Sequence, residues 1–338
     1  MSDTQFVDPP QPQNADGLPL RGAVAAMLDF DQVAAHIERA HTLRRDNGSP
    51  DPTDYLLRKK CLVDVDGTLY ATRAGVLCFG RHPQQIMPRA VVDLGHYRGV
   101  EQVSFDVVHL QKDIGGTLFD QLGRIETYLW NNTHHGMTVA ENSFQRVDVH
   151  EYPQIVIREL CANMLAHRDY QHADSACRVM LFRNRIEWAS PGGLPPHVTV
   201  ENILNAQVSR NPTILAVFYE AGYVEAFGQG LDTVVAVLKK EDHDPPVFRD
   251  TGESFIVGVY GRPLDMFVID GVYATLSESQ RKILGFIRRK GEVTPQDIRV
   301  FMGNRALRSV QRDTAALVEA ELVEPTGGAR AVRYRLRT

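Results

Sequence analysis

The stretch ELCANMLAHRDY, residues 159–170, places a carboxylate, an amide and an imidazole four residues apart, at Glu159, Asn163 and His167. Side chains four apart share one face of an α-helix. A carboxylate can activate water and an amide oxygen can bind Mg²⁺, so this stripe would suit the border of a cavity. A solvated or internally satisfied stripe is the alternative. The other faces of the helix would be apolar, with Ile157, Leu160, Cys161, Met164 and Leu165.

Two glycine pairs follow this helix in the chain. IEWASPGGLPP predicts a strand that ends at Gly192 and Gly193, and Gly228 and Gly230 open the helix GLDTVVAVLKKE. Glycine allows close backbone approach, and the free N–H groups of a helix N-terminus bind phosphate oxygens. Each signal is weak alone. Taken in order along the chain, these residues could provide a water activator, a magnesium ligand and a phosphate-binding loop. Together they predict one nucleotide site.

The elements around these residues predict a helix and mostly antiparallel sheet layer over residues 140–262. A hairpin turning at Arg183-Asn184 precedes the first glycine pair, and a second hairpin is expected within PPVFRDTGESFIVGVYG. Asn211 and Pro212 have the residue types of a helix cap and first turn, for a helix that stops at Gly222.

The N-terminal part divides into two expected segments. Residues 1–22 are rich in Pro, Asp, Gln and Asn, which predicts a disordered or loosely attached arm. Residues 23–139 predict a small α/β region with a hairpin at Asp66-Gly67 and a helix on which Leu118, Leu122, Ile125 and Leu129 recur at the helical period. No catalytic constellation is evident there.

The C-terminal segment, residues 276–338, differs from the rest in charge. It carries 13 Lys and Arg against 7 Asp and Glu, a net charge of +6. Because the whole chain has −5, residues 1–275 carry −11. A basic module on an acidic body is typical of a protein in which one domain meets nucleic acid. Residues 263–275 would be the linker.

The order of elements in this segment, three helices and then a hairpin at Gly327-Gly328, predicts a winged helix-turn-helix, and SVQRDTAALVEAELV resembles the recognition helix of DeoR-type regulators. Residues at the start of that helix would enter the major groove, and wing arginines would contact phosphate or the minor groove. A dimerisation module is the alternative. The expected DNA-binding residues are Arg305, Arg308, Ser309, Gln311 and Arg312 on the helix, with Arg330, Arg333 and Arg335 on the wing.

Composition limits the class of protein. The chain has 338 residues, 43% hydrophobic and 23% charged, which suits roughly two or three soluble domains. No stretch reaches the roughly 18 to 20 apolar residues of a membrane span, and the N-terminus lacks signal-peptide features, so we expect a cytoplasmic protein with no membrane partner. The four cysteines form no C-x-x-C pair and are expected to be buried thiols. The sequence contains no G-x-x-x-x-G-K-[ST] loop, so we do not expect a helicase.

Four blocks, RELCANMLAHRDY, IEWASPGGLPP, SRNPTILAVFYEAGYVEAFGQGL and FIVGVYG, resemble the GHKL-type ATP-binding domain of bacterial transcriptional regulators that are often labelled RecG-related. The GHKL superfamily includes gyrase, Hsp90, histidine kinases and MutL. The preceding segment LLRKKCLVDVDGTLYATRAGVLCFGRHPQQIMPRAVV resembles the connector behind an AlbA-type (Schlafen-like) DNA-binding domain, of which only the rear part is expected here. The resemblance implies an α+β fold: an α/β connector, a GHKL-like helix/antiparallel-sheet sandwich and the winged helix.

The resemblance also implies roles for single residues. Glu159 matches the general base of the superfamily and Asn163 its magnesium ligand, while Gly228 and Gly230 match the phosphate-loop glycines. Ser190, with Gly192 and Gly193, stands where the superfamily has an Asp-x-Gly-x-Gly block whose Asp reads adenine. A serine hydroxyl can accept one hydrogen bond but carries no charge.

These features predict a DNA-binding transcriptional regulator, a homodimer on double-stranded DNA, whose nucleotide domain binds ATP and Mg²⁺ as a sensor. Two alternatives stay open: an active Mg-dependent ATPase acting on DNA, and a degenerate domain used only for oligomerisation.

Overall fold

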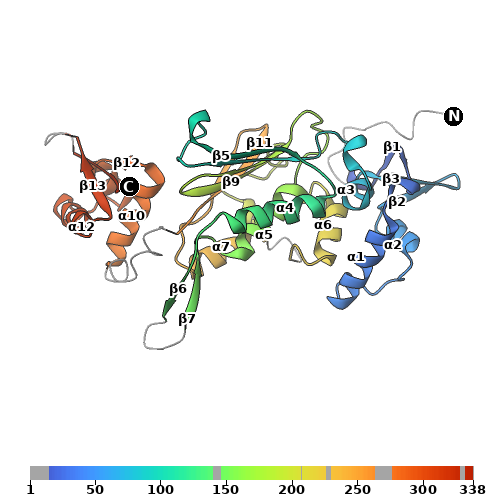
Figure 1. Cartoon of the computed structure of the whole chain (residues 1–338), viewed down its shortest axis with the longest axis horizontal. Helices are drawn as coiled ribbons and strands as arrows, with labels where there is room; N and C mark the ends of the chain where they lie inside the picture. Colours follow the sequence, from blue (N-terminus) through green and yellow to red (C-terminus); the bar gives the residue numbers. More distant parts are fainter. Residues whose placement is uncertain are drawn as a thin grey trace.

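The computed structural model describes residues 15–139, 146–206, 208–225, 230–262, 276–327 and 332–337. Figure 1 shows an N-terminal unit, a central sheet with helices, and a C-terminal module, arranged in chain order along the long axis. The fold mixes helices with several sheets, which confirms the expected α+β class. No helix in the described part of the chain is long and apolar enough to span a bilayer.

The N-terminal unit is built on a three-stranded sheet in the order β1-β3-β2. The predicted hairpin turns at Asp66 and Gly67, both with positive φ, and the Asp64 carboxylate accepts a hydrogen bond from the Gly67 amide at 2.8 Å. The elements are η2 (Ala15–Gly17), β1 (Pro19–Val24), η3 (Ala25–Met27), α1 (Phe30–Thr42), α2 (Pro52–Arg58), β2 (Leu62–Val65), β3 (Thr68–Thr72) and α3 (Arg73–Phe79).

Residues 15–22, expected within a loose arm, belong to this unit, and that part of the expectation was wrong. Asp16 is fully buried, and its carboxylate accepts a hydrogen bond from the Ile214 amide at 2.9 Å. The composition rich in Pro, Asp, Gln and Asn suggested disorder, but the Asp16 carboxylate caps a helix 198 residues further along the chain. Residues 1–14 lie outside the described part.

The central sheet has six strands in the order β10-β11-β9-β8-β4-β5. All neighbours are antiparallel except β4 and β8, which run parallel with Val92 opposite Cys177. The sheet therefore takes strands from both sides of the boundary expected at 139/140. The strands are β4 (Val92–Tyr97), β5 (Val107–Ile114), β8 (Cys177–Leu181), β9 (Arg185–Pro191), β10 (Val247–Asp250) and β11 (Ser254–Tyr260).

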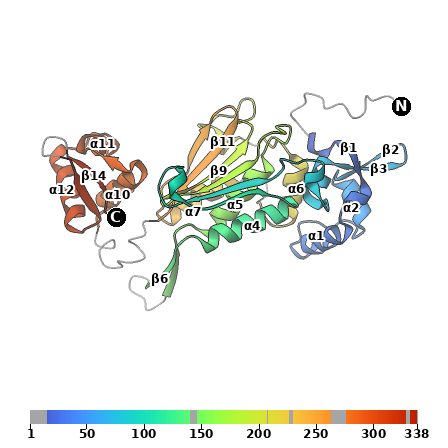
Figure 2. The same cartoon turned by 45° about the horizontal axis from the view of Figure 1, so that its top comes forward.

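Helices cover one face of this sheet (Figures 1 and 2). One continuous core, from Ala23 to Val259, joins the N-terminal unit to the central sheet, and the Trp188 indole donates to Cys161 Sγ at 3.2 Å between sheet and helix. The helices are α4 (Leu118–Asn131), α5 (Gln154–Ala166), α6 (Pro212–Glu220) and α7 (Gly230–Lys240); η4 (Pro83–Gln85), η5 (Ser104–Asp106), η6 (Ile203–Asn205) and the ribbon of β6 (His135–Val139) with β7 (Arg146–His150) complete the region.

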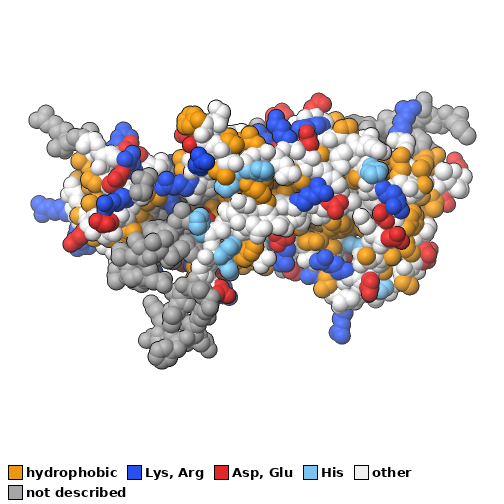
Figure 3. Space-filling view, in the orientation of Figure 1, with side chains coloured by type: hydrophobic (Ala, Val, Ile, Leu, Met, Phe, Trp, Pro, Cys, Tyr) orange, Lys and Arg blue, Asp and Glu red, His pale blue; other side chains and the backbone are white. Residues whose placement is uncertain are grey.

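The C-terminal module has a separate core, which includes Ile283, Val310 and Leu317. Its three-stranded sheet has the order β12-β14-β13, and the turn between its second and third helices has positive φ at Gly303 and Asn304. Basic and acidic side chains intermix on the module face seen in Figure 3. The elements are α10 (Glu278–Lys290), β12 (Glu292–Val293), α11 (Pro295–Phe301), α12 (Leu307–Glu319), β13 (Val323–Thr326) and β14 (Arg333–Leu336).

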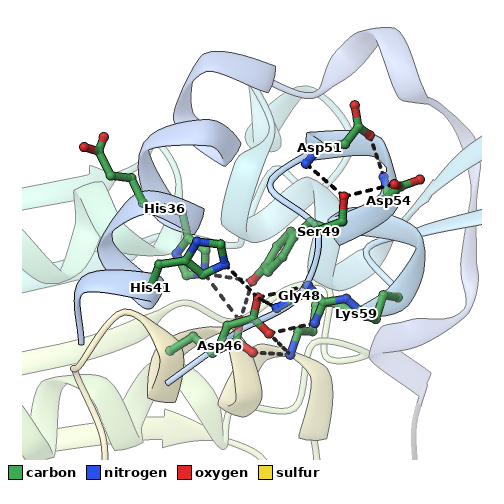
Figure 4. Close-up of polar contacts among 12 residues, drawn as sticks. His36, His41, Asp46, Gly48, Ser49, Asp51, Asp54 and Lys59 are labelled. Carbon is green, nitrogen blue, oxygen red and sulfur yellow. Dashed lines mark hydrogen bonds and ion pairs between the residues drawn. The ribbon is translucent and has the colours of Figure 1, made fainter. Parts of the chain in front are cut away.

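A buried polar cluster connects the N-terminal unit to α6. The Tyr55 hydroxyl donates to the Glu220 carboxylate at 2.6 Å and lies 2.7 Å from His36 Nε2. Lys59 forms ion pairs with both Glu220 and Asp46. Figure 4 shows this convergence from α1, α2 and the loop between them. The C-terminal end of α6 is therefore fixed by the N-terminal unit.

Candidate functional site

A cavity of about 350 Å³ lies between α5, β9 and the start of α7. The polar stripe identified in the sequence borders it, because Glu159, Asn163 and His167 all contribute to the lining. Gly228 lies outside the described residues. The other expected nucleotide-site residues also line this cavity: Ser190, Gly192, Gly193 and Gly230.

Glu159 is the buried acid of the cavity, with 3% of its surface exposed. The pKa of its carboxyl is raised from 4.5 to about 7, mainly by burial, and the charge of the neighbouring Glu225 acts in the same direction. The Asn163 amide, which donates to Glu159 Oε1 at 3.3 Å, acts in the opposite direction. A carboxyl with a pKa near neutrality can accept a proton from water at physiological pH.

Gly230 brings the N-terminus of α7 against these two side chains. A Cβ atom at this position would overlap Glu159 Oε1 and lie 3.1 Å from Asn163 Nδ2. Only glycine therefore lets the first turn of α7 approach the acid and the amide this closely. The approach leaves the amide groups of a helix N-terminus beside the cavity, where they favour an anion.

The donor set fits a magnesium-bound nucleotide. Asn163 uses its NH₂ group toward Glu159, so its carbonyl oxygen stays available to a cation, and no hydrogen bond from the described residues occupies it. Mg²⁺ prefers a few protein oxygens together with phosphate and water. Among the described residues no group of three or more His, Cys, Asp or Glu could hold a metal ion.

Ser190 and the glycines after it form the opposite wall. The Ser190 hydroxyl donates to the Met164 carbonyl of α5 at 2.9 Å, so toward a ligand it can act only as an acceptor. Gly192 has φ of +90°, and a Cβ there would lie 2.6 Å from Arg210 Nη1. A Cβ at Gly193 would lie 2.6 Å from the Gly252 carbonyl. Both positions therefore require glycine for close packing.

Arg210 is a cavity residue that sequence reasoning missed. Its guanidinium donates to the His167 carbonyl at 3.2 Å and to the Gly193 carbonyl at 2.8 Å, which ties the end of α5 to the glycine segment. Burial together with the Arg210 charge lowers the pKa of His167 to about 4, so its imidazole is neutral. The segment SRNPTIL contained the only signal, a basic residue just before a predicted helix.

Asn211 does not use its side chain to cap α6, as its residue type suggested. Its amide donates instead to the Ala166 and Arg168 carbonyls at 2.9 and 2.7 Å, where it closes the C-terminal end of α5. The N-terminus of α6 receives the Asp16 carboxylate in its place. Asn211 and Arg210 thus both hold the α5 terminus that carries His167.

The N-terminal unit supports the wall formed by Val224 and Glu225. Arg45 donates to the Val224 carbonyl at 2.9 Å and to the Tyr219 carbonyl at 2.7 Å, and it pairs with the Glu225 carboxylate at 3.6 Å. The rest of the lining is mainly apolar and suits a flat ring. It includes Trp188, Leu194, Val198, Ile203, Leu215, Phe255 and Val257.

The expected DNA-binding residues lie on the C-terminal module in different states. Arg308 and Gln311 are exposed, Ser309 is half-buried, and the Arg312 side chain is 75% exposed. Arg305 donates to Asp313 at 2.9 Å and to Ser279 at 2.8 Å, so it is engaged within the module. On the hairpin, Arg333 pairs with Glu292 at 3.6 Å and Arg335 with Glu324 at 2.6 Å. Arg330 lies outside the described residues.

A comparison with known protein families gives a match in the central region of the chain. Residues 174–259 match the family described as "Putative ATP-dependent DNA helicase recG C-terminal". This region contains an ATPase-like domain. The match begins after α5, so it covers β8 to β11 and α7 but not Glu159 or Asn163. None of the curated proteins searched matches the chain significantly.

A solved structure is similar over nearly the whole chain. The crystal structure of the DIP2311 protein from Corynebacterium diphtheriae superimposes with a TM-score of 0.59 at 19% sequence identity. The match covers 95% of the present chain and 64% of the other, so this chain spans somewhat less than two thirds of that protein's length. At this identity the likeness concerns the fold.

Proposed function

We propose that this protein is a DNA-binding transcriptional regulator whose GHKL-type domain binds ATP with Mg²⁺ as a sensor. The proposal rests on one observation. Glu159, Asn163 and Gly230 line the same cavity as the end of β9 with Ser190, Gly192 and Gly193. These residues come from α5, α7 and β9, and each supplies a group that a nucleotide needs. The match of residues 174–259 to an ATPase-like family supports the same reading.

Each group has a distinct task in this proposal. Asn163 offers an amide oxygen to the cation, the N-terminus of α7 faces the phosphates, and the apolar wall holds the base. Ser190 accepts a hydrogen bond from an exocyclic amine, which is weaker and less selective than a carboxylate in that place. Bound Mg²⁺ would neutralise phosphate charge.

The C-terminal module supplies the DNA-binding part of the proposal. Helix, helix, turn, helix and a two-stranded hairpin is the order of a winged helix-turn-helix, and α12 would be the recognition helix. The exposed Arg308, Gln311 and Arg312 near its start would read base edges, and Arg333 and Arg335 on the hairpin would contact phosphates after exchanging their acidic partners. We place the protein in the cytoplasm, as a homodimer on double-stranded DNA.

A titration of the full chain with ATP, with and without Mg²⁺, tests the nucleotide part. Binding that strengthens with Mg²⁺ is expected. If no nucleotide binds, the cavity belongs to a degenerate domain that serves oligomerisation, and the sensor proposal is wrong. GTP and CTP serve as comparison ligands, and a small preference for ATP is expected because Ser190 replaces the acid.

An active ATPase is the second candidate, and the pKa of about 7 at Glu159 favours it. A general base works best when its pKa is near the working pH. Phosphate release from ATP by the wild type, above the level of a Glu159→Gln variant, would assign hydrolysis to this site. Binding without such release leaves the sensor role.

A further inference from the structure

Helix α7 begins at the candidate nucleotide site and ends just before a segment that contacts the C-terminal module. Its first residue, Gly230, is buried against Glu159 and Asn163 at the cavity. Its eleven residues make a rod of roughly 16 Å at 1.5 Å per residue. Val234 and Leu238 are buried in the main core, so the rod is held along its length against α5.

The segment after α7 is fastened to the helix and to the central sheet. The His243 amide donates to the Leu238 carbonyl at 2.8 Å. Arg262, just beyond β11, donates to Glu241 at 3.1 Å and to His243 Nε2 at 3.0 Å. A displacement of α7 would therefore carry residues 241–244 with it.

This same segment contacts the C-terminal module through α10. Asp244 Oδ2 lies 3.6 Å from Arg288 Nη2, and Asp242 Oδ2 lies 4.0 Å from Arg281 Nη1. Gly285 lies on the same face of α10 between the two arginines, and a Cβ there would be in ordinary van der Waals contact, 3.5 Å, with both carboxylate oxygens of Asp244. Arg288 is only 8% exposed, so Asp244 compensates a buried charge.

A second contact holds α10 independently of α7. The side-chain amide of Asn184, in the turn between β8 and β9, donates to the Arg288 carbonyl at 3.1 Å. Helix α10 is thus held at one point by the central sheet and at another by the segment after α7. The module has a separate hydrophobic core, and the contacts described at this junction are polar. The orientation of the module can therefore change without breaking either core.

We propose that α7 couples the nucleotide cavity to the DNA-binding module, with Asp244 and Asp242 as the residues that transmit its position to α10. This inference rests on the proposed function, because it gives the regulation of that site. A nucleotide at the N-terminus of α7 shifts the helix relative to the β8–β9 turn. Since α10 packs directly on α12, the shift reaches the residues that read DNA.

The experiment measures both affinities in the full chain. The probes are a non-hydrolysable ATP analogue with Mg²⁺ and a labelled duplex of about 30 base pairs, which spans two half-sites one turn apart. In the wild type, saturating analogue should change the Kd for the duplex by a factor of roughly 5 to 150, and saturating duplex should change the Kd for the analogue by the same factor. Binding of both ligands with a factor of one overturns the coupling and leaves the proposed function standing.

Two variants test the route. Asp244→Asn leaves the buried Arg288 without a full opposite charge and should reduce the coupling factor to about one, while each ligand alone binds within about threefold of the wild-type Kd. Asp242→Asn, at a side chain that is 79% exposed and tolerant of change, should reduce the factor in part. Lys282→Gln is the matched control, because Lys282 is on α10 but pairs with Glu278 of the same helix.

Full coupling in both aspartate variants would show that another route connects the sites and would overturn the assignment to α7. Failure of the wild type to bind the analogue, or to bind any duplex at low salt, overturns the proposed function itself. If Asp244→Asn does not fold, the exposed Asp242→Asn variant still decides the route, because equal coupling in that variant and in Lys282→Gln contradicts it.

Discussion

The Asn163 amide donates to Glu159 Oε1 at 3.3 Å, which joins two side chains one turn apart on α5 at the border of the cavity. The NH₂ group of Asn163 steadies the acid, and its oxygen is left for a cation. Because the same hydrogen bond lowers the pKa of Glu159, removing it should shift that pKa upward.

Asn163→Ala should therefore abolish the effect of Mg²⁺ on ATP affinity and leave the weaker Mg-free affinity nearly unchanged. The measurement is a pair of ATP titrations, with Mg²⁺ and with a chelator. Asn132→Ala removes an exposed amide from the end of α4 and serves as control. Equal affinities of wild type with and without Mg²⁺ would remove the cation role from Asn163.

Glu159→Gln should bind ATP as the wild type does but lose any turnover. The loss of a general base typically costs roughly 100- to 10,000-fold in rate. Where the wild type hydrolyses ATP, its rate should increase with pH up to about 7, because the ionised carboxylate is the active form. Phosphate release followed across this pH range checks both points, and an unchanged rate in the variant would exclude Glu159 as the base.

The same carboxyl predicts a stability change with pH. Its folded pKa of about 7 exceeds the ordinary 4.5, so between these values the folded state holds the proton more tightly than the unfolded state. The contribution to stability is fully present below pH 4.5 and is lost as pH increases through 7, on the order of 3 kcal/mol in total. Glu159→Gln should flatten this part of the curve. Denaturant unfolding at pH 5 and pH 7.5, with Glu38→Gln at an exposed position on α1 as the comparison, measures the difference.

Much of the secondary structure could be predicted from the sequence, because it depends on local patterns. The turn at Asp66-Gly67 needs only two residues that tolerate positive φ, and the helical repeat of Leu122, Ile125 and Leu129 marks the buried face of α4. The stripe of Glu159 and Asn163 could likewise be placed on one helix face, and the structure brings it to the cavity.

Long-range partners could not be predicted in this way. The parallel pairing of Val92 with Cys177 joins segments on both sides of the expected domain boundary, and no local pattern encodes it. Asp16 looked like part of a polar arm because its partner, the Ile214 amide, is distant in sequence. Arg210 had no distinguishing spacing, since its partners are backbone carbonyls, which every residue type presents.

Tyr55→Phe should destabilise the junction between the N-terminal unit and α6. The hydroxyl is fully buried between His36 and Glu220, so its loss leaves buried polar groups with fewer partners, at a cost of about 1 to 3 kcal/mol. Chemical denaturation of the full chain measures this cost. Tyr260→Phe, at a half-buried position of β11, should change the free energy of unfolding by less than about 0.5 kcal/mol. Equal stability of Tyr55→Phe and wild type would mean that the cluster does not hold the junction.

The residues proposed to bind DNA should separate into two classes. Arg312, 75% exposed near the start of α12, is positioned to read a base, so Arg312→Ala should relax sequence preference by roughly 1 to 3 kcal/mol at one base pair. Arg333 on the hairpin would contact phosphate, so Arg333→Ala should weaken all duplexes alike and reduce the salt slope by roughly one unit.

Affinity measured against salt for selected and scrambled duplexes distinguishes these two outcomes in the full chain. Arg124→Ala removes the same charge from an exposed position on α4, far from the module in sequence, and controls for net charge alone. Arg305→Ala should act differently from both, because Arg305 is paired with the buried Asp313; its loss should lower the stability of the module before it changes sequence preference. If Arg312→Ala and Arg333→Ala weaken binding no more than Arg124→Ala does, the C-terminal module acts through protein contacts and the regulator proposal is wrong.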